Sequence, residues 1–272
     1  MNASAKRSVA SRAPAIVAIA CWFDLLDYGR MIDEAGFDPA HVKARRPIAR
    51  LRAFQRIVAK HSSGGFPTLV MNDGAVAYSN VEQVRSDKVW RFIQRCWLLY
   101  GEATRTDTRN GGPGLRAVIA VGLRAKGSNR GILAQDEAIA TIIDDLDAGR
   151  ISREDALAEA RKVRRVFDIV PQLQANFAFT RAYEAEQCGT KAGFPGPNLF
   201  LDLTVFKDGV PPWMTSGPAN LWKAKKASLS TAFIAITNME EVPADAAHAA
   251  FRTGRELLHV LSFSGDQEAS DD

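Results

Sequence analysis

The apolar positions along the chain form two kinds of pattern: continuous runs as long as a β-strand, and segments in which they recur at helical spacing. Residues 15–23 (AIVAIACWF) form a continuous apolar run, which is typical of a central strand covered on both faces. In residues 33–61 the apolar positions recur three or four apart, which predicts a helix. Residues 66–71 and 75–78 then flank Asn72-Asp73-Gly74, a pattern that predicts a β-hairpin.

The remaining pattern adds further helices and strands in an order that defines the fold class. We expect helices over 86–100, 176–188 and 244–261, strands over 115–123, 198–206 and 228–236, and two charged helices within 134–166, the second beginning after an N-cap at Ser152. Strands and helices mixed in this order predict an α+β sandwich, with helices packed on a mostly antiparallel sheet.

The same pattern predicts the domain organisation. We expect one domain over 14–262, interrupted by a helical insertion at 134–166. Residues 1–13 are small and basic and residues 263–272 are acidic, so both are predicted to be disordered tails.

Composition narrows the class of protein. The 272 residues are 46% hydrophobic and 24% charged, which is ordinary for a globular chain. The cysteines, Cys21, Cys96 and Cys188, are odd in number and lie outside any CxxC pattern, which argues against a disulfide framework or a zinc site. No apolar run approaches the ~18 residues of a membrane span. We therefore expect a cytoplasmic protein that has no membrane partner.

A basic stretch offers three interpretations. The net charge is +4, and residues 41–60 carry seven of the basic side chains with no acidic one: Lys43, Arg45, Arg46, Arg50, Arg52, Arg56 and Lys60. They could form a solvated helix face, attract a polyphosphate ligand or bind nucleic acid. Nucleic acid is the less favoured partner, because Phe54 is the only aromatic residue among these charges.

Two aspartates stand where apolar strands are predicted to end. Asp24 directly follows the first strand, and Asp73 lies at the tip of the hairpin. Neighbouring carboxylates at strand ends would give the hard oxygen site that Mg²⁺ or Mn²⁺ prefers. Turn geometry is an alternative explanation for Asp73, and strand-end capping is one for Asp24.

Four segments in order carry a resemblance to a known family. They are the first strand with its turn (WFDLLDYG, 22–29), the hairpin (MNDGAVA, 71–77), the strand LRAVIAVG (115–122) and the block 173–202. Across residues 15–260 the chain resembles the class III nucleotidyl cyclases. It is most similar to the bacterial pyrimidine cyclases of Pycsar antiphage systems.

This resemblance implies a reaction and a set of residues for it. Asp24, Asp73 and the main-chain carbonyl of Leu25 would hold two divalent ions, Mn²⁺ or Mg²⁺. The backbone amides of the turn would cradle the β- and γ-phosphates, through Leu25, Leu26, Tyr28 and Gly29. The ribose 3′-hydroxyl would attack the α-phosphorus, and pyrophosphate would leave. The family also implies a head-to-tail homodimer with both sites at the interface.

Transition-state groups and base choice depend on individual positions. Purine cyclases carry an Asn with an Arg four residues later, whereas Arg181 here follows Asn176 by five. That one-residue shift turns the arginine by about 100° around a helix. A helix N-cap is the alternative role for Asn176. Arg116 is the alternative phosphate contact. Purine cyclases also carry Lys or Glu four residues before the second aspartate, where this chain has Leu69. That difference predicts a pyrimidine substrate, UTP or CTP.

The cyclic product would be an antiphage signal read by a separate cyclic-nucleotide-activated effector. The alternatives are a purine nucleotide cyclase, or a catalytically inactive cyclase-like module that binds nucleotide or a partner. A basic nucleic-acid-binding protein is a further alternative.

Overall fold

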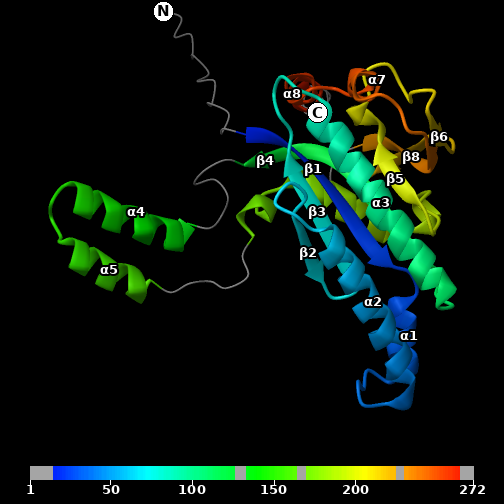
Figure 1. Cartoon of the computed structure of the whole chain (residues 1–272), viewed down its shortest axis with the longest axis horizontal. Helices are drawn as coiled ribbons and strands as arrows, with labels where there is room; N and C mark the ends of the chain where they lie inside the picture. The colour runs from blue at the N-terminus through cyan, green and yellow to red at the C-terminus, as the bar shows by residue number, and fades with distance from the viewer. Residues whose placement is uncertain (1–14, 126–132, 164–169, 225–229, 264–272) are drawn as a thin grey trace, which may run out of the picture. The chain divides into compact units, whose positions relative to one another are not determined.

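The computed structural model describes residues 15–125, 133–163, 170–224 and 230–263 (Figure 1). The predicted tails at 1–13 and 263–272 lie outside these residues, except for Phe263, which belongs to the last helix. The chain divides into two compact units. One comprises 17–123 with 176–272, and the other 1–16 with 124–175.

The described residues contain one sheet of eight strands. Their bounds are β1 Ala15–Leu25, β2 Thr68–Met71, β3 Gly74–Asn80, β4 Leu115–Ala125, β5 Leu199–Asp202, β6 Met214–Ser216, β7 Asn220–Lys223 and β8 Ser230–Met239. The order is β2-β3-β1-β4-β5-β8-β6, with β7 also paired to β8. The pairs β1–β3, β2–β3, β5–β8, β6–β8 and β7–β8 are antiparallel, and β4–β5 is parallel. The predicted α+β class with a mostly antiparallel sheet is confirmed.

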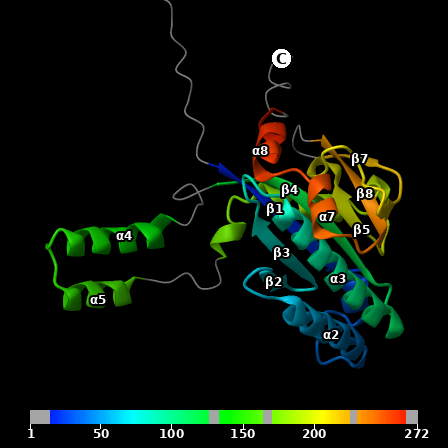
Figure 2. The ribbon, with the colours of Figure 1, turned by 45° about the horizontal axis from the view of Figure 1, so that its top comes forward.

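Eight α-helices accompany this sheet in the part of the chain that the structure describes. They are α1 Tyr28–Glu34, α2 Arg45–His61, α3 Asp87–Arg109, α4 Leu133–Asp147, α5 Arg153–Lys162, α6 Phe177–Cys188, α7 Ala244–Ala250 and α8 Gly254–Phe263. Helices α2 and α3 lie side by side (Figures 1 and 2). None of the described helices combines the length and the apolar character that crossing a membrane requires.

Strand alternation decides what each face of the sheet contacts. Ile19, Cys21 and Phe23 of β1 belong to the main core together with α2 and α3. The alternate positions face the other way, toward α6, because side chains along a strand alternate between faces. Gly122 of β4 permits this second contact: a Cβ there would lie 2.6 Å from the backbone nitrogen of Ala178 in α6.

Several predicted boundaries were wrong for local reasons. The single helix over 33–61 is two helices, because Gly36 and Phe37 adopt left-handed φ angles of 65° and 55° after α1. Strand 198–206 ends at Asp202, whose carboxylate accepts a hydrogen bond from the Thr204 amide and begins a 3-10 turn. The closing helix 244–261 breaks into α7 and α8, and β6 and β7 were not predicted.

The second unit contains the predicted helical segment. Helices α4 and α5 fall within 134–166 apart from one residue at the start, and the described part ends at 163. Ser152 is the N-cap of α5, as predicted, since its hydroxyl accepts a hydrogen bond of 3.0 Å from the Asp155 amide. The three cysteines, Cys21, Cys96 and Cys188, are free thiols.

Candidate active site

The hairpin brings the two predicted metal-binding aspartates together. In the β1–β3 ladder Asp24 lies opposite Gly74, and the Leu25 amide donates to the Asp73 carbonyl at 3.2 Å. Met71 pairs with Gly74, so Asn72 and Asp73 form a tight two-residue turn in which Asn72 has a φ of 52°. Asp24 and Asp73 are therefore neighbours, although 49 residues separate them in the sequence.

Asp24 occupies an electrostatically unfavourable position. Its pKa is raised to about 8, first by burial and then by the negative charges of Glu186 and Asp73. The positive charge of Arg116 acts in the opposite direction. Carboxylates gathered with too little positive charge around them are a site that a divalent cation would stabilise.

Glu186 and Arg116 form an ion pair at this site. The Arg116 Nε and Nη2 atoms donate to one oxygen of Glu186 at 2.8 and 2.5 Å, and Nη1 donates to the Phe194 carbonyl at 3.1 Å. Glu186 is fully buried. Sequence analysis did not identify Glu186. One signal was available, because Glu186 lies four residues after Ala182 and so continues the small-residue face of α6.

The oxygen donors fit a magnesium or manganese ion that is completed by substrate and water. Among the described residues, no group of three or more His, Cys, Asp or Glu side chains is arranged to hold a metal. Two carboxylates are sufficient for Mg²⁺, which commonly takes its other ligands from water and substrate phosphates. Asp24 and Asp73, with the Leu25 carbonyl, are the candidate protein ligands.

The turn after Asp24 differs in part from the expected phosphate cradle. The amides of Leu25 and Leu26 already donate to the carbonyls of Asp73 and Gly114, each at 3.2 Å. In the structure these two amides are therefore engaged by main-chain carbonyls, and Tyr28 and Gly29 are the remaining members of the expected cradle. The Tyr28 side chain is buried in the main core.

Leu69 lies on the same face of the sheet as Asp24. It pairs with Val76 in the β2–β3 ladder, and Val76 pairs with Trp22 in the β1–β3 ladder. Paired residues in a sheet share a face, and Trp22 shares its face with Asp24 two positions later. The position expected to govern base choice thus faces the side of the sheet that carries Asp24.

Asn176 and Arg181 make contacts within the chain. The Asn176 side chain caps α6 by accepting from the Phe179 amide at 3.1 Å. Arg181 donates to the Val121 carbonyl at 2.7 Å and lies 3.7 Å from Asp202. Asn176 precedes Glu186 by ten residues, or about 15 Å along a helix. The structure therefore brings Arg116 to Asp24 and leaves Asn176 at the far end of α6.

The basic stretch is not one uniform helix face. Arg50 is buried, and Lys60 pairs with Glu102 at 2.8 Å. A hollow of about 450 Å³ has both charges in its wall, four cationic side chains and two carboxylates: Arg30, Lys43, Arg45, Arg46, Asp27 and Glu34. Arg30 is paired with both carboxylates. The basic side chains of this stretch are thus divided between the protein interior, ion pairs and this hollow.

Comparison with known proteins gives limited information. No family model and no curated protein matches the sequence. Among solved structures, the chain is similar to the guanylyl cyclase Cya2, with 12% identity, a TM-score of 0.47, and coverage of 84% of this chain and 95% of that one.

Two further structures are similar at the same level. The guanylate cyclase domain of RhGC from Catenaria anguillulae has 9% identity, a TM-score of 0.46, and coverage of 84% and 100%. The adenylyl cyclase CyaB from P. aeruginosa has 9% identity, a TM-score of 0.42, and coverage of 84% and 97%. Similarity at this level assigns neither a family nor an activity to the chain.

Proposed function

We propose that the protein is a nucleotidyl cyclase that converts UTP or CTP to the 3′,5′-cyclic monophosphate and pyrophosphate. The observation that carries the proposal is the adjacency of Asp24 and Asp73 at the hairpin tip, with Arg116 beside Asp24. Asp24 is half-buried and has a pKa near 8, so its ionised form is unfavourable in the absence of a cation. Carboxyl groups with such perturbed pKa values are found preferentially at functional sites.

Each residue of the group has a task in this proposal. Divalent ions, when bound, would acidify the ribose 3′-hydroxyl and neutralise charge on the triphosphate. Asp24 and Asp73 would hold them beside the Leu25 carbonyl. Arg116 would turn from Glu186 toward the phosphates and offset the negative charge that develops in the transition state. Catalysis would then consist mainly of positioning and charge neutralisation.

Leu69 supports the preference for a pyrimidine. It faces the Asp24 side of the sheet, and its side chain can neither donate nor accept a hydrogen bond. A polar group there would be needed to read the edge of a purine, and its absence removes that discrimination.

The proposal extends to assembly and biological role. The enzyme would be a homodimer with two sites at its interface. Its cyclic nucleotide would activate a separate effector in antiphage defence. Light scattering after size exclusion tests the dimer, and co-expression with a candidate effector during phage infection tests the role.

The chemical test uses the purified full chain. It is incubated with each of the four ribonucleoside triphosphates and Mn²⁺, and products are identified by mass spectrometry. We expect cUMP or cCMP from the wild type and none from Asp73→Ala. Asp208→Ala, which removes an exposed carboxylate, is the matched control and should keep full turnover.

The alternatives predict different results. Cyclic AMP or cyclic GMP as the main product would identify a purine cyclase. Absence of product together with Mn²⁺-dependent nucleotide binding would identify an inactive binding module. An active Asp73→Ala variant would contradict the metal assignment.

A further inference from the structure

Arg50 is a buried charge within an otherwise mostly exposed basic stretch. It extends from α2, its side chain is only 2% exposed, and it forms a two-pronged ion pair with Asp107 of α3. Nε lies 2.7 Å from one carboxylate oxygen and Nη2 lies 2.8 Å from the other. Paired, fork-shaped contacts of this kind fix an arginine in one orientation.

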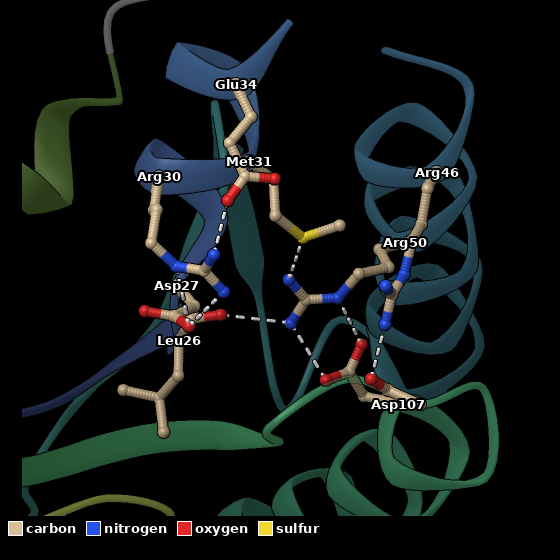
Figure 3. A network of polar contacts seen from close by, with 9 residues as sticks. Leu26, Asp27, Arg30, Met31, Glu34, Arg46, Arg50 and Asp107 are labelled. Atoms are coloured by element: carbon tan, nitrogen blue, oxygen red, sulfur yellow. Dashed lines mark hydrogen bonds and ion pairs between the residues drawn. The ribbon is translucent and has the colours of Figure 1, made fainter. Parts of the chain in front are cut away.

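The pair takes part in a ring of hydrogen bonds around Leu26, and Figure 3 shows the part of it that joins Arg50 to Asp107 and Leu26. Arg50 Nη2 also donates to the Leu26 carbonyl at 3.1 Å. Asp107 accepts from the Gly114 amide at 2.9 Å, and the Gly114 carbonyl accepts from the Leu26 amide at 3.2 Å. Both main-chain polar groups of Leu26 are therefore held by one connected network.

This ring of hydrogen bonds determines the direction of the Leu25 carbonyl. The Leu25 carbonyl and the Leu26 amide belong to the same peptide group, which is planar and trans. Once the Leu26 N–H is directed at Gly114, the Leu25 carbonyl must point the opposite way. The Leu25 carbonyl is the group that would complete the metal site together with Asp24, the preceding residue in the chain.

Arg50 cannot serve as a substrate contact. Its Nη1 atom meets the Met31 sulfur at 3.1 Å, and its other nitrogens are engaged by Asp107 and Leu26. A second arginine braces the same loop, since Arg46 donates to the Gly111 carbonyl at 2.5 Å. The loop before β4 is thus tied to α2 directly through Gly111, and indirectly through Asp107, which joins Arg50 to Gly114.

We propose that Arg50 is a positioning residue. Together with Asp107 and Gly114, it holds the Leu25–Leu26 peptide in the orientation that presents the Leu25 carbonyl to a divalent ion. This inference rests on the proposed function for the identity of the ligand. Its test therefore includes measurements that do not depend on turnover.

The main variant is Arg50→Lys, which keeps the charge and loses the fork, with Arg52→Lys on the same helix as the exposed control. Mn²⁺ affinity is measured on the full chain by electron paramagnetic resonance of free Mn²⁺. Exchange of the Leu26 amide is followed by NMR. We expect about 10-fold to 100-fold weaker Mn²⁺ binding and faster exchange in Arg50→Lys, because groups that orient metal ligands typically contribute this much.

A second variant separates loss of the guanidinium group from loss of the fold. Arg50→Ala should recover Mn²⁺ affinity when millimolar guanidinium chloride refills the space, whereas sodium chloride at equal concentration should not restore it. If Arg50→Lys folds less stably but binds Mn²⁺ as the wild type does, the positioning role is wrong. If the wild type itself binds no Mn²⁺, the proposed function fails, and unchanged Leu26 exchange in Arg50→Lys would separately contradict the ring.

Discussion

Arg116 and Glu186 form a nearly buried ion pair, with Nη2 2.5 Å from Oε1, although seventy positions separate them in the chain. Arg116 comes from β4 and Glu186 from the last turn of α6. Both charges act on Asp24, Glu186 raising its pKa and Arg116 opposing that rise. In the proposed function, Arg116 pairs with Glu186 in the absence of substrate and would exchange this partner for the more negative triphosphate.

Arg116 rather than Arg181 should stabilise the transition state. Arg116→Ala should lower kcat by about 10²- to 10³-fold, the usual effect of losing one charge-stabilising donor. Arg181→Lys should lower kcat less than 10-fold, because Arg181 contacts Val121 and Asp202. Steady-state kinetics on the preferred nucleotide make the comparison.

In Arg116→Ala, the negative charge of Glu186 is left without its partner, and this charge alone could lower turnover. The double variant Arg116→Ala with Glu186→Gln removes that charge and should remain as slow. Recovery of turnover in the double variant would show that Arg116 acts only by neutralising Glu186.

Asp24→Asn should stabilise the metal-free protein above neutral pH. The carboxyl has a pKa of about 8 when folded against 3.8 when unfolded, so the folded state binds the extra proton between these values. Stability due to Asp24 therefore falls as pH rises from about 4 to 8 and then levels off. At pH 8.5 the asparagine variant should be more stable by at least about 1 kcal/mol, since one pKa unit equals about 1.4 kcal/mol.

Thermal melts of both proteins across pH 4–9 in EDTA measure this difference. Mn²⁺ should then raise the melting temperature of the wild type more than that of Asp24→Asn, because only the wild type retains both carboxylates. Parallel curves for the two proteins over the whole pH range would contradict the assigned electrostatics.

Leu69→Lys should shift the base preference. The new ammonium group would lie on the face that carries Asp24 and could donate to a purine edge. In a mixture of the four triphosphates, the ratio of purine to pyrimidine products should rise by about 10-fold or more, since a hydrogen bond from a charged group contributes about 1.5 kcal/mol or more. Leu69→Met is the conservative control, and an unchanged ratio in Leu69→Lys would remove Leu69 from base selection.

Gly122→Ala should destabilise the fold and weaken the site together. Its Cβ would meet the backbone of Ala178 at 2.6 Å, so α6 would have to move and carry Glu186 with it. Overpacking of this kind costs about 1–3 kcal/mol. Gly64→Ala, where a Cβ meets nothing within 4 Å, should change the unfolding free energy by less than about 0.5 kcal/mol in urea titrations.

Local patterns in the sequence were sufficient for the class of fold and for the aspartate pair. The apolar run before Asp24 and the Asn-Asp-Gly turn specify a strand and a hairpin through short-range backbone preferences, and the structure contains both. The α+β class followed from the order of such elements. Boundaries were less accurate where a single residue such as Gly36 or Asp202 ended an element.

Only the tertiary structure identified the residues that act at a distance. For Glu186 and Arg50, nothing local in the sequence indicates the partner that each meets, because that partner comes from another element. Their burial is decided by how α6 and α2 pack on the sheet, and a buried charge is tolerated only when such packing supplies an opposite one. The sequence by itself therefore determined that Asp24 and Asp73 lie at the ends of neighbouring strands. Long-range packing decided which charged groups shift the pKa of Asp24 and hold the adjoining main chain.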